Sequence, residues 1–371
     1  MTAPTSPLSL ARPRAGGLSR RRLLQGGAGA LAVGMIGAPA IAQARSLRVA
    51  SYGGYFENSF KEHVFPEFTA ATGIAVESVT QPNSADWLVT MQQAAMAGQT
   101  PTDVSLYGRD TMIKASRIGG LLQPLDLSKI PTASGLDPRF LYADATGPVG
   151  VGAMSWFVSM VVNPTEISPA PTSWAEFWDS SVYARSLGVS REFNSNFLDV
   201  VAATFFEGPE VLSTEEGISA VIAKIAELKP NVALWWSAES QMEQAMKNGD
   251  VVGGTYYHDV AGIMAADGFP IASIFPKEGN PQNYGSWCLS AGSEKAAEAQ
   301  EFMTFSCLPA TQALMARKIG TAPLMDRAST DLTEDEFAAV SGAPAITPNF
   351  EAYLDHETFM KESWEKMLSE S

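Results

Sequence analysis

Cysteine and histidine, which supply many nucleophiles and bases in enzymes, are scarce in this 371-residue chain. It has two cysteines, Cys288 and Cys307, and three histidines, none of them close to a cysteine in sequence. The chain also lacks a Gly-x-Ser-x-Gly elbow, a Walker-type phosphate loop and a His-Glu-x-x-His helix. We therefore predict that the protein is not an enzyme and holds no cofactor; an enzyme built on this chain would need His258 or Glu192 as its base.

Long hydrophobic runs are absent after residue 44. Before it, the chain contains five arginines and no acidic residue, and the run Ser-Arg-Arg-Arg-Leu-Leu-Gln at 19–25 has the pattern of a twin-arginine export signal. A short apolar run at 26–41 and a small-x-small site at 42–44 follow. We predict a signal peptide cleaved after Ala44 and a periplasmic protein, with an N-terminal membrane anchor as the alternative.

Basic residues are outnumbered, 25 against 40 acidic ones. Without the five arginines before residue 44, 20 face 40 and the formal charge is −20. So acidic a chain is a poor ligand for nucleic acid or an anionic membrane, and its field mildly favours cationic solutes. The remaining span of about 327 residues is long enough for two domains with cores of their own.

Alternation and helical spacing predict an α/β chain. A strand at 46–51 ends at Gly53-Gly54, and Phe56, Phe60, Val64 and Phe68 then recur every four residues, as on one face of a helix. A second strand follows at 74–79, so the mature chain opens β-α-β. Later strands and helices alternate, which is typical of mostly parallel sheets. Two short apolar runs within 147–162 have the character of strands that cross between lobes.

Aromatic and polar residues recur where the predicted strands end. Ligands bind at the carboxyl ends of strands in open α/β sheets, so we expect these side chains to converge on a cleft. Any one of them alone is more typical of a residue that covers the core. The candidates are Tyr52, Tyr55, Tyr107, Gly108, Arg109, Glu192, Trp236, Ser237, Tyr256, Tyr257, Asp259, Tyr284 and Ser286.

The two cysteines lie on neighbouring predicted elements. Cys288 belongs to a strand at 284–289, and Cys307 ends a helix at 294–306 that should run back over that strand. Export to an oxidising compartment would permit a disulfide. We expect two buried free thiols, with the disulfide as the alternative.

Several segments resemble one family. They are Leu-Arg-Val-Ala-Ser-Tyr-Gly-Gly-Tyr at 47–55, Phe-Pro-Glu-Phe-Thr-Ala-Ala-Thr-Gly-Ile-Ala-Val at 65–76, Asp-Val-Ser-Leu-Tyr at 103–107, Thr-Ser-Trp-Ala-Glu-Phe-Trp at 172–178 and Phe-Pro-Lys-Glu-Gly at 275–279. Their order is similar to that of the periplasmic solute-binding proteins of ABC importers, specifically the spermidine/putrescine-binding group.

The resemblance implies a type II-like fold of two lobes joined by crossover strands, which close on solute about a hinge. Lobe 1 would comprise residues 46–152 and 284–321, and lobe 2 residues 153–283 and 322–371. It also implies a monomeric receptor that delivers a small solute to a membrane permease.

By position, the family's aromatic residues fall on Tyr52 and Tyr55 in lobe 1 and on Tyr256 or Tyr257 in lobe 2. Its tyrosine loop falls on 107–110, where Arg109 replaces a small polar residue. One acidic anchor falls on or beside Glu192 and a second near Ser195, while a Trp-x-Asp falls near 283–285 without its carboxylate.

A polyamine needs aromatic faces along its methylenes and carboxylates at its ends. The carboxylates that remain are Glu192 and Asp259, with Asp110 third. This shortage, with Arg109 and Arg191, leaves a substituted amine, an amino acid derivative or another small organic solute open beside a polyamine.

Ferric iron is a further alternative. Adjacent phenols such as Tyr256 and Tyr257, with His258 and Asp259 next to them, are donors that suit iron. Alternation at a strand end predicts instead that one tyrosine faces the cleft and its neighbour the core.

Overall fold

The computed structural model describes residues 45–53, 55–82 and 84–370. The signal peptide predicted for residues 1–44 and the side chain of Tyr55 therefore lie outside the described part of the chain. Within it, no helix is both long and apolar enough to cross a bilayer.

The chain opens with β1 (Ser46–Tyr52), β2 (Ala75–Gln81) and β3 (Val104–Gly108), which pair in parallel with β1 in the centre. The helices between and after them are α1 (Tyr55–Ser59), α2 (Phe65–Thr72), α3 (Ser84–Met96) and α4 (Arg109–Ile118). A π-helical turn at Phe60–Val64 joins α1 to α2, so the helix is interrupted just before Pro66, which lies in the first turn of α2. Gly73 ends α2 at φ 72°, a left-handed conformation that glycine adopts without strain.

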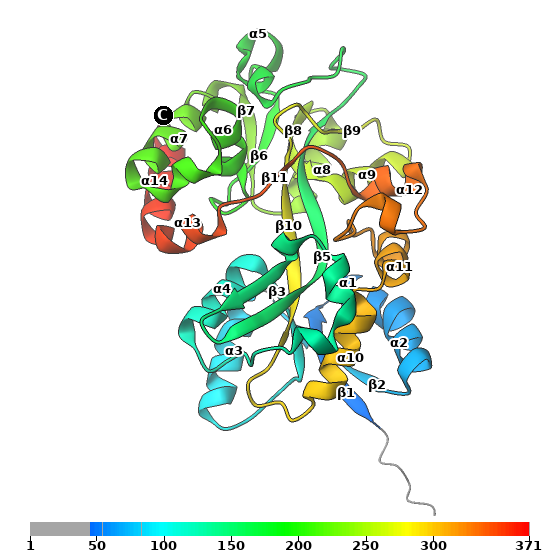
Figure 1. Ribbon diagram of the computed structural model, residues 1–371. Coiled ribbons are helices and arrows are strands. Elements are labelled where there is room, and N and C mark those ends of the chain that lie inside the picture. Colours follow the sequence, from blue (N-terminus) through cyan, green and yellow to red (C-terminus); the bar gives the residue numbers. More distant parts are fainter. Residues whose placement is uncertain (1–44, 54, 83, 371) are drawn as a thin grey trace, which may run out of the picture. The chain divides into compact units, whose positions relative to one another are not determined.

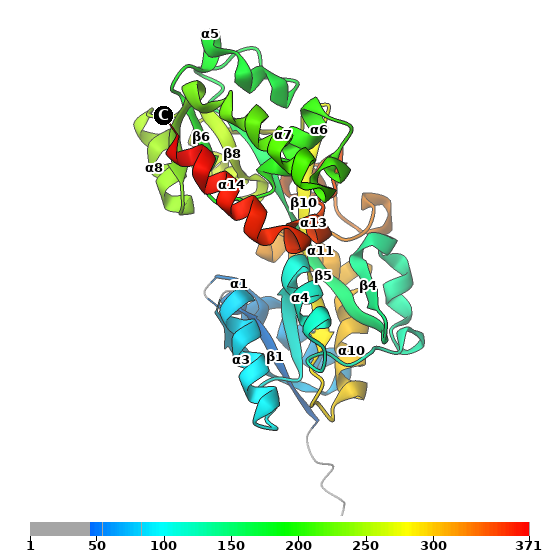
Figure 2. The same cartoon turned by 90° about the vertical axis from the view of Figure 1, so that its left-hand side faces the viewer.

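Two long strands cross the middle of the fold (Figures 1 and 2). β5 (Gly147–Val162) is one 16-residue strand where the sequence predicted two short ones, and β10 (Asn280–Leu289) runs antiparallel to it. The sheet order is β2-β1-β3-β10-β5-β8-β6-β7. The prediction of mostly parallel sheets is therefore wrong: β10 is antiparallel to β3 and β5, and β5 is antiparallel to β8.

The remaining strands are β4 (Leu141–Asp144), β6 (Leu187–Ser190), β7 (Val232–Trp236), β8 (Gly253–Tyr257), β9 (Ala272–Ile274) and β11 (Ala345–Ile346). The remaining α-helices are α5 (Ser180–Tyr183), α6 (Phe197–Phe205), α7 (Glu215–Ala226), α8 (Glu239–Asn248), α9 (His258–Ala266), α10 (Ala296–Ser306), α11 (Pro309–Ile319), α12 (Glu334–Val340), α13 (Phe350–Asp355) and α14 (Glu357–Ser369). The N-cap of α8 is Ala238.

Two large hydrophobic cores lie on either side of the crossing. The first joins β1, β3 and β10 to α2, α10 and α11 around Phe60, Phe68 and Phe302. The second joins β6 to α6, α7 and α14 around Trp174 and Trp364. The α/β class and the two lobes are thus confirmed. Cys288 and Cys307 are both buried, free thiols, as expected.

A third segment crosses beside β5. Ser155 and Ala322 exchange two backbone hydrogen bonds of 3.2 and 2.8 Å. The Ser155 hydroxyl also donates to the Ala322 oxygen at 3.1 Å and accepts from Gln282 Nε2 of β10 at 2.9 Å. Ser155 therefore ties together all three segments at the point where they pass between the cores.

Candidate functional site

Two cavities adjoin where the crossing strands leave the first core. The larger has a volume of about 700 Å³ and the smaller about 220 Å³. Trp156 and Tyr257 line both of them. The volume of the larger cavity is typical of pockets that bind small organic molecules.

Aromatic side chains from four elements form one wall of the larger cavity. Tyr52 ends β1, Phe56 lies on α1, Trp156 lies on β5, and Tyr257 ends β8. Strand alternation explains the last two, because their neighbours Phe157 and Tyr256 are buried. The Tyr52 hydroxyl accepts a hydrogen bond from the Gly108 amide at 3.1 Å, which fixes the ring beside β3.

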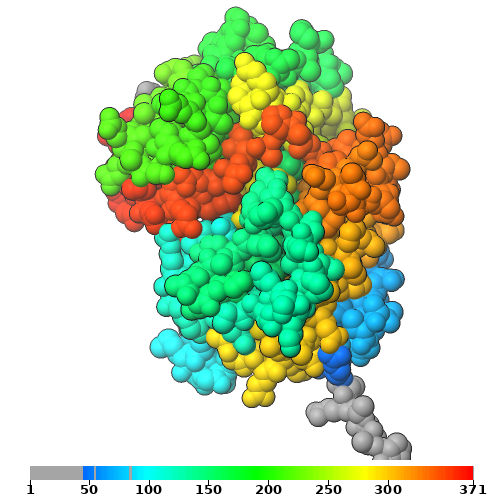
Figure 3. All heavy atoms as spheres, viewed as in Figure 1, coloured from blue at the N-terminus to red at the C-terminus, as the bar shows by residue number. Residues whose placement is uncertain are grey.

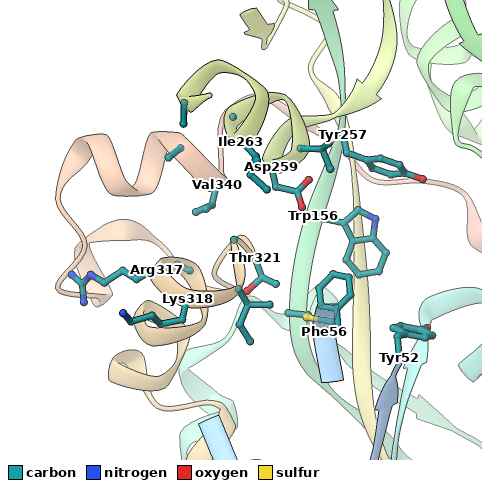
Figure 4. Close-up of a pocket in the computed structure, with 18 of the residues that line it drawn as sticks. Tyr52, Phe56, Trp156, Tyr257, Asp259, Ile263, Arg317, Lys318, Thr321 and Val340 are labelled. Atoms are coloured by element: carbon teal, nitrogen blue, oxygen red, sulfur yellow. The ribbon is translucent and has the colours of Figure 1, made fainter. Parts of the chain in front are cut away.

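Asp259 places a carboxylate in this aromatic cavity. It lies in the first turn of α9, and Figure 4 shows it directed toward the same space as Trp156. Its Oδ1 is buried and has no hydrogen-bond partner among the described residues. Burial raises the pKa of Asp259 to about 6, against the lowering effect of the backbone amides at the helix start. A buried anion without a counter-ion is energetically costly unless a cation neutralises it.

The cations that line the larger cavity lie away from this carboxylate. Arg317 and Lys318, at the end of α11, extend on the far side from Trp156 (Figure 4). Arg317 pairs with Glu336 at 2.8 Å and with Asp331 at 3.1 Å. Its charge is therefore neutralised within the fold and leaves Asp259 uncompensated.

The smaller cavity is more polar. Asp110 and Lys114 of α4 line it together with Glu357 of α14, and Lys114 Nζ lies 2.8 Å from Glu357 Oε1. Ser195 also lines it, with a buried hydroxyl that has no partner among the described residues. Asn283 of β10 completes the wall and donates to Asn196 at 2.6 Å.

Comparison with known proteins assigns the family. The family model described as bacterial extracellular solute-binding protein matches residues 64–345. The chain belongs to this family. It is a family of small-solute receptors rather than enzymes, and the resemblance found in the sequence is confirmed.

Individual relatives are also solute-binding proteins. The gamma-aminobutyric acid-binding protein of Pseudomonas aeruginosa is 26% identical over 329 residues, covering 86% of this chain and 90% of that protein. The spermidine/putrescine-binding periplasmic protein of Escherichia coli is 26% identical over 318 residues, covering 84% and 86%. The crystal structure of an ABC transporter substrate-binding protein from Bradyrhizobium japonicum has a TM-score of 0.73 at 16% identity, covering 88% of this chain and 100% of that chain.

Of the site residues predicted from the sequence of this solute-binding protein, three line the larger cavity. They are Tyr52, Tyr257 and Asp259. Asp110 and Ser195, named through the resemblance, line the smaller one.

Several other candidates are buried in the cores. Tyr107 is 1% exposed, Tyr256 is 1% exposed and Ser286 is fully buried. Tyr284 is buried between Phe140 and Phe350 and donates to the Arg139 oxygen at 2.8 Å, and Trp236 packs edge-on against Tyr256. These side chains sit on the core-facing side of their strand ends, so they line neither cavity.

The polar candidates are dispersed. Arg109 lies over the Tyr142 ring at 4.1 Å, outside both cavities, and Gly108 contributes only its amide to Tyr52. Glu192 and Ser237 are exposed and line neither cavity. Their strands end as predicted, but the side chains turn to solvent.

The iron alternative does not fit this arrangement. Tyr256 is in the core, where its hydroxyl donates to the Glu239 backbone at 3.2 Å, and burial raises the pKa of Tyr257 to about 12. His258 is buried and held by the Ser273 hydroxyl at 2.8 Å and the Ala338 oxygen at 3.1 Å. The described residues include no group of three His, Cys, Asp or Glu placed to hold a metal ion.

Sequence reasoning missed Trp156, Phe56 and Glu239. Trp156 lies in the segment that was expected to cross between lobes, and a large aromatic residue there was a usable signal. Phe56 was assigned to the core face of its helix. Glu239, the first residue of α8, had no distinguishing pattern.

Proposed function

We propose that this protein binds a small organic amine at Asp259 and delivers it to the permease of an ABC importer. The observation that carries the proposal is the Asp259 carboxylate at an aromatic cavity, because its buried Oδ1 has no hydrogen-bond partner among the described residues. An ammonium group would neutralise this charge through a charge-assisted hydrogen bond. The faces of Trp156, Tyr257 and Tyr52 would then cover the carbon chain and add cation–π attraction.

The relatives support the same class. Gamma-aminobutyric acid and the polyamines named for them differ in length and in net charge. They share a primary ammonium group on a short aliphatic chain. A receptor that anchors that common part would place it on Asp259 and would distinguish the solutes by what lies beyond it, in the smaller cavity.

We infer the cellular setting from the chain and the family together. The protein would be exported through the twin-arginine route, cleaved after Ala44, and act in the periplasm as a monomer. Residues 46–152 and 284–321 would form one lobe and residues 153–283 and 322–371 the other. The lobes would close on the solute about the crossing segments tied at Ser155.

The test is binding by the Asp259→Asn variant. Thermal unfolding with putrescine, spermidine and gamma-aminobutyric acid would first identify a bound amine; one present at a hundred times its dissociation constant adds about 2.7 kcal/mol of stability. Asp259→Asn should then weaken that amine by about 1.5–3 kcal/mol, because it removes the charged partner.

Asp267→Asn is the matched control. It removes the same charge from the other end of α9, at an exposed residue, and should leave affinity unchanged. Equal affinity of wild type and Asp259→Asn for the amine would exclude Asp259 from the site. A panel in which no amine binds would refute the amine class.

A further inference from the structure

A second carboxylate lies at the same cavity. Glu239 is the first residue of α8 and lines the larger cavity together with Asp259 and Tyr257. The Tyr256 hydroxyl donates to its backbone oxygen at 3.2 Å. Because Tyr257 and Asp259 follow directly after Tyr256, this bond fixes the start of α8 beside the start of α9. Both carboxylates therefore belong to the lining of one cavity, on helices whose first turns lie side by side.

Neither acid of this pair has a counter-ion within the described residues, and Lys318, which also lines the cavity, lies on its far side (Figure 4). Among the described residues, neither Glu239 nor Asp259 forms an ion pair, whereas Glu243, one turn further along α8, pairs with Lys247. Arg317, on the far side of the cavity, is already paired with Asp331 and Glu336. The proximity has an electrostatic signature, because the charge of Glu239 contributes to raising the pKa values of Asp259 and Tyr257, although burial contributes more.

We propose that Glu239 is the specificity-determining partner of Asp259 and that the two carboxylates together select a cationic head group bearing several N–H donors. The inference rests on the proposed function, since it names the chemistry of the head group bound at the same site. A primary ammonium has three N–H donors and a guanidinium five, so either can bond to two acceptors at once. A trimethylated ammonium carries the same charge without a donor.

Asp259 and Glu239 differ in exposure, which fits different roles for them in binding the head group. Asp259 is half-buried and its Oδ1 is fully buried, while Glu239 is exposed. The head group would first bind Asp259, and Glu239 would then close over its remaining N–H bonds. Selectivity against methylated amines would depend on both acids, because the second acceptor is what a methylated head group cannot satisfy.

The test compares a primary amine with its trimethylated form. The probes are gamma-aminobutyric acid and putrescine, each beside the derivative that carries a trimethylammonium group. Titration calorimetry on wild type, Glu239→Gln and Asp259→Asn should show about 10- to 100-fold weaker binding of the primary amine to Glu239→Gln, as expected for a lost charge-assisted bond. The wild-type preference for the primary over the trimethylated probe should shrink in the same variant.

Glu243→Gln is the control, because it removes an acid one turn away that is already ion-paired. It should change neither affinity nor preference. Unfolding midpoints without solute show that each variant is folded.

The possible results distinguish the selectivity proposed for Glu239 from the amine site proposed at Asp259. If Asp259→Asn loses binding and Glu239→Gln does not, the pair is refuted and the amine site stands. If Glu239→Gln weakens both probes equally, Glu239 acts only as a distant charge and the selectivity claim is refuted. If neither variant changes binding of the primary amine, the proposed function itself is refuted.

Discussion

Whether the Asp259 carboxyl is protonated should determine how tightly the solute binds. The pKa of this carboxyl is raised to about 6, and only its ionised form attracts an ammonium group. Below that value, each further unit of pH should weaken amine binding by about tenfold, because the solute must displace a proton. Calorimetry at about pH 5 and about pH 8 should show this loss for wild type but not for Asp259→Asn. A flat profile for wild type would mean that the solute does not bind the carboxylate.

Protonation of Asp259 should also affect the stability of the fold, with a pH dependence opposite to that of an ion-paired acid. Burial raises the pKa of Asp259 above its unfolded value of 3.8, so the folded protein holds the proton more tightly than the unfolded chain. This stabilises the fold below about pH 4 and is lost as pH rises through about 6. Asp259→Asn should therefore raise the unfolding midpoint of the solute-free protein at neutral pH while it weakens binding, whereas Asp267→Asn should do neither. A lower midpoint would contradict the inference that the ionised Asp259 carboxylate destabilises the solute-free fold.

Single residues also show the limit of prediction from sequence. Alternation predicts that one of Tyr256 and Tyr257 faces the cavity and the other the core, and the structure shows that Tyr257 is the one that lines the cavity. The same rule could not be applied to Tyr107 or Tyr284, because it needs the side of the sheet to be known first. That side is set by packing against distant residues such as Phe140 and Phe350.

Helices α4 and α13–α14 show how separate elements hold the lobes together. Arg117 of α4 pairs with Asp355 at 2.7 Å and with Glu351, and Lys114 pairs with Glu357 at 2.8 Å. In Figure 3 the C-terminal residues, orange to red, form a band above the cyan and teal residues of the first lobe. These side chains are about half exposed, so each pair contributes little to unfolding. Their joint effect is on how firmly the second lobe is held against the first.

Arg117→Ala should therefore change unfolding free energy by less than about 1 kcal/mol and yet speed release of the solute several-fold at low salt. The difference should vanish at about 1 M salt, where the screening length falls to about 3 Å. Stopped-flow release measures both. Arg45→Ala is the matched control, since Arg45 also pairs with two acids, Glu298 and Glu301, but within the first lobe. Equal acceleration in both variants would show that the pairs act only on general stability.

The elements themselves were largely predictable, and their directions were not. Hydrophobic spacing located the helical segment after β1, because Phe60, Val64 and Phe68 are buried as one face. Glycines within Gly147–Val162 broke the pattern and split β5 into two predicted pieces. A Cβ at Gly152 would come within 2.9 Å of Phe140 Cβ, so close packing inside a continuous strand accounts for that glycine. The direction of a strand depends on which core each of its ends enters. Hydrophobic periodicity carries no information about this direction.

At the scale of the whole molecule, the three crossing segments are the natural place for movement. Each lobe has its own core, and β5, β10 and the segment around Ala322 run between them in the described part of the chain, tied at Ser155. Amine binding between Asp259 of one lobe and Tyr52 of the other should therefore draw the lobes together without altering either core. Small-angle scattering should show a smaller radius of gyration with saturating amine, and far-ultraviolet circular dichroism should stay unchanged.

Asp259→Asn separates closure driven by the solute from nonspecific compaction, because it should keep the larger radius under the same amine concentration. Ser155→Ala removes the side-chain bonds to Ala322 and Gln282 but keeps the two backbone bonds, so it should preserve the extent of closure and lower the unfolding midpoint modestly. An unchanged radius in the wild type, despite proven binding, would mean that the solute enters a site already closed. In that case release would be set by the side chains at the mouth of the cavity rather than by movement of the lobes.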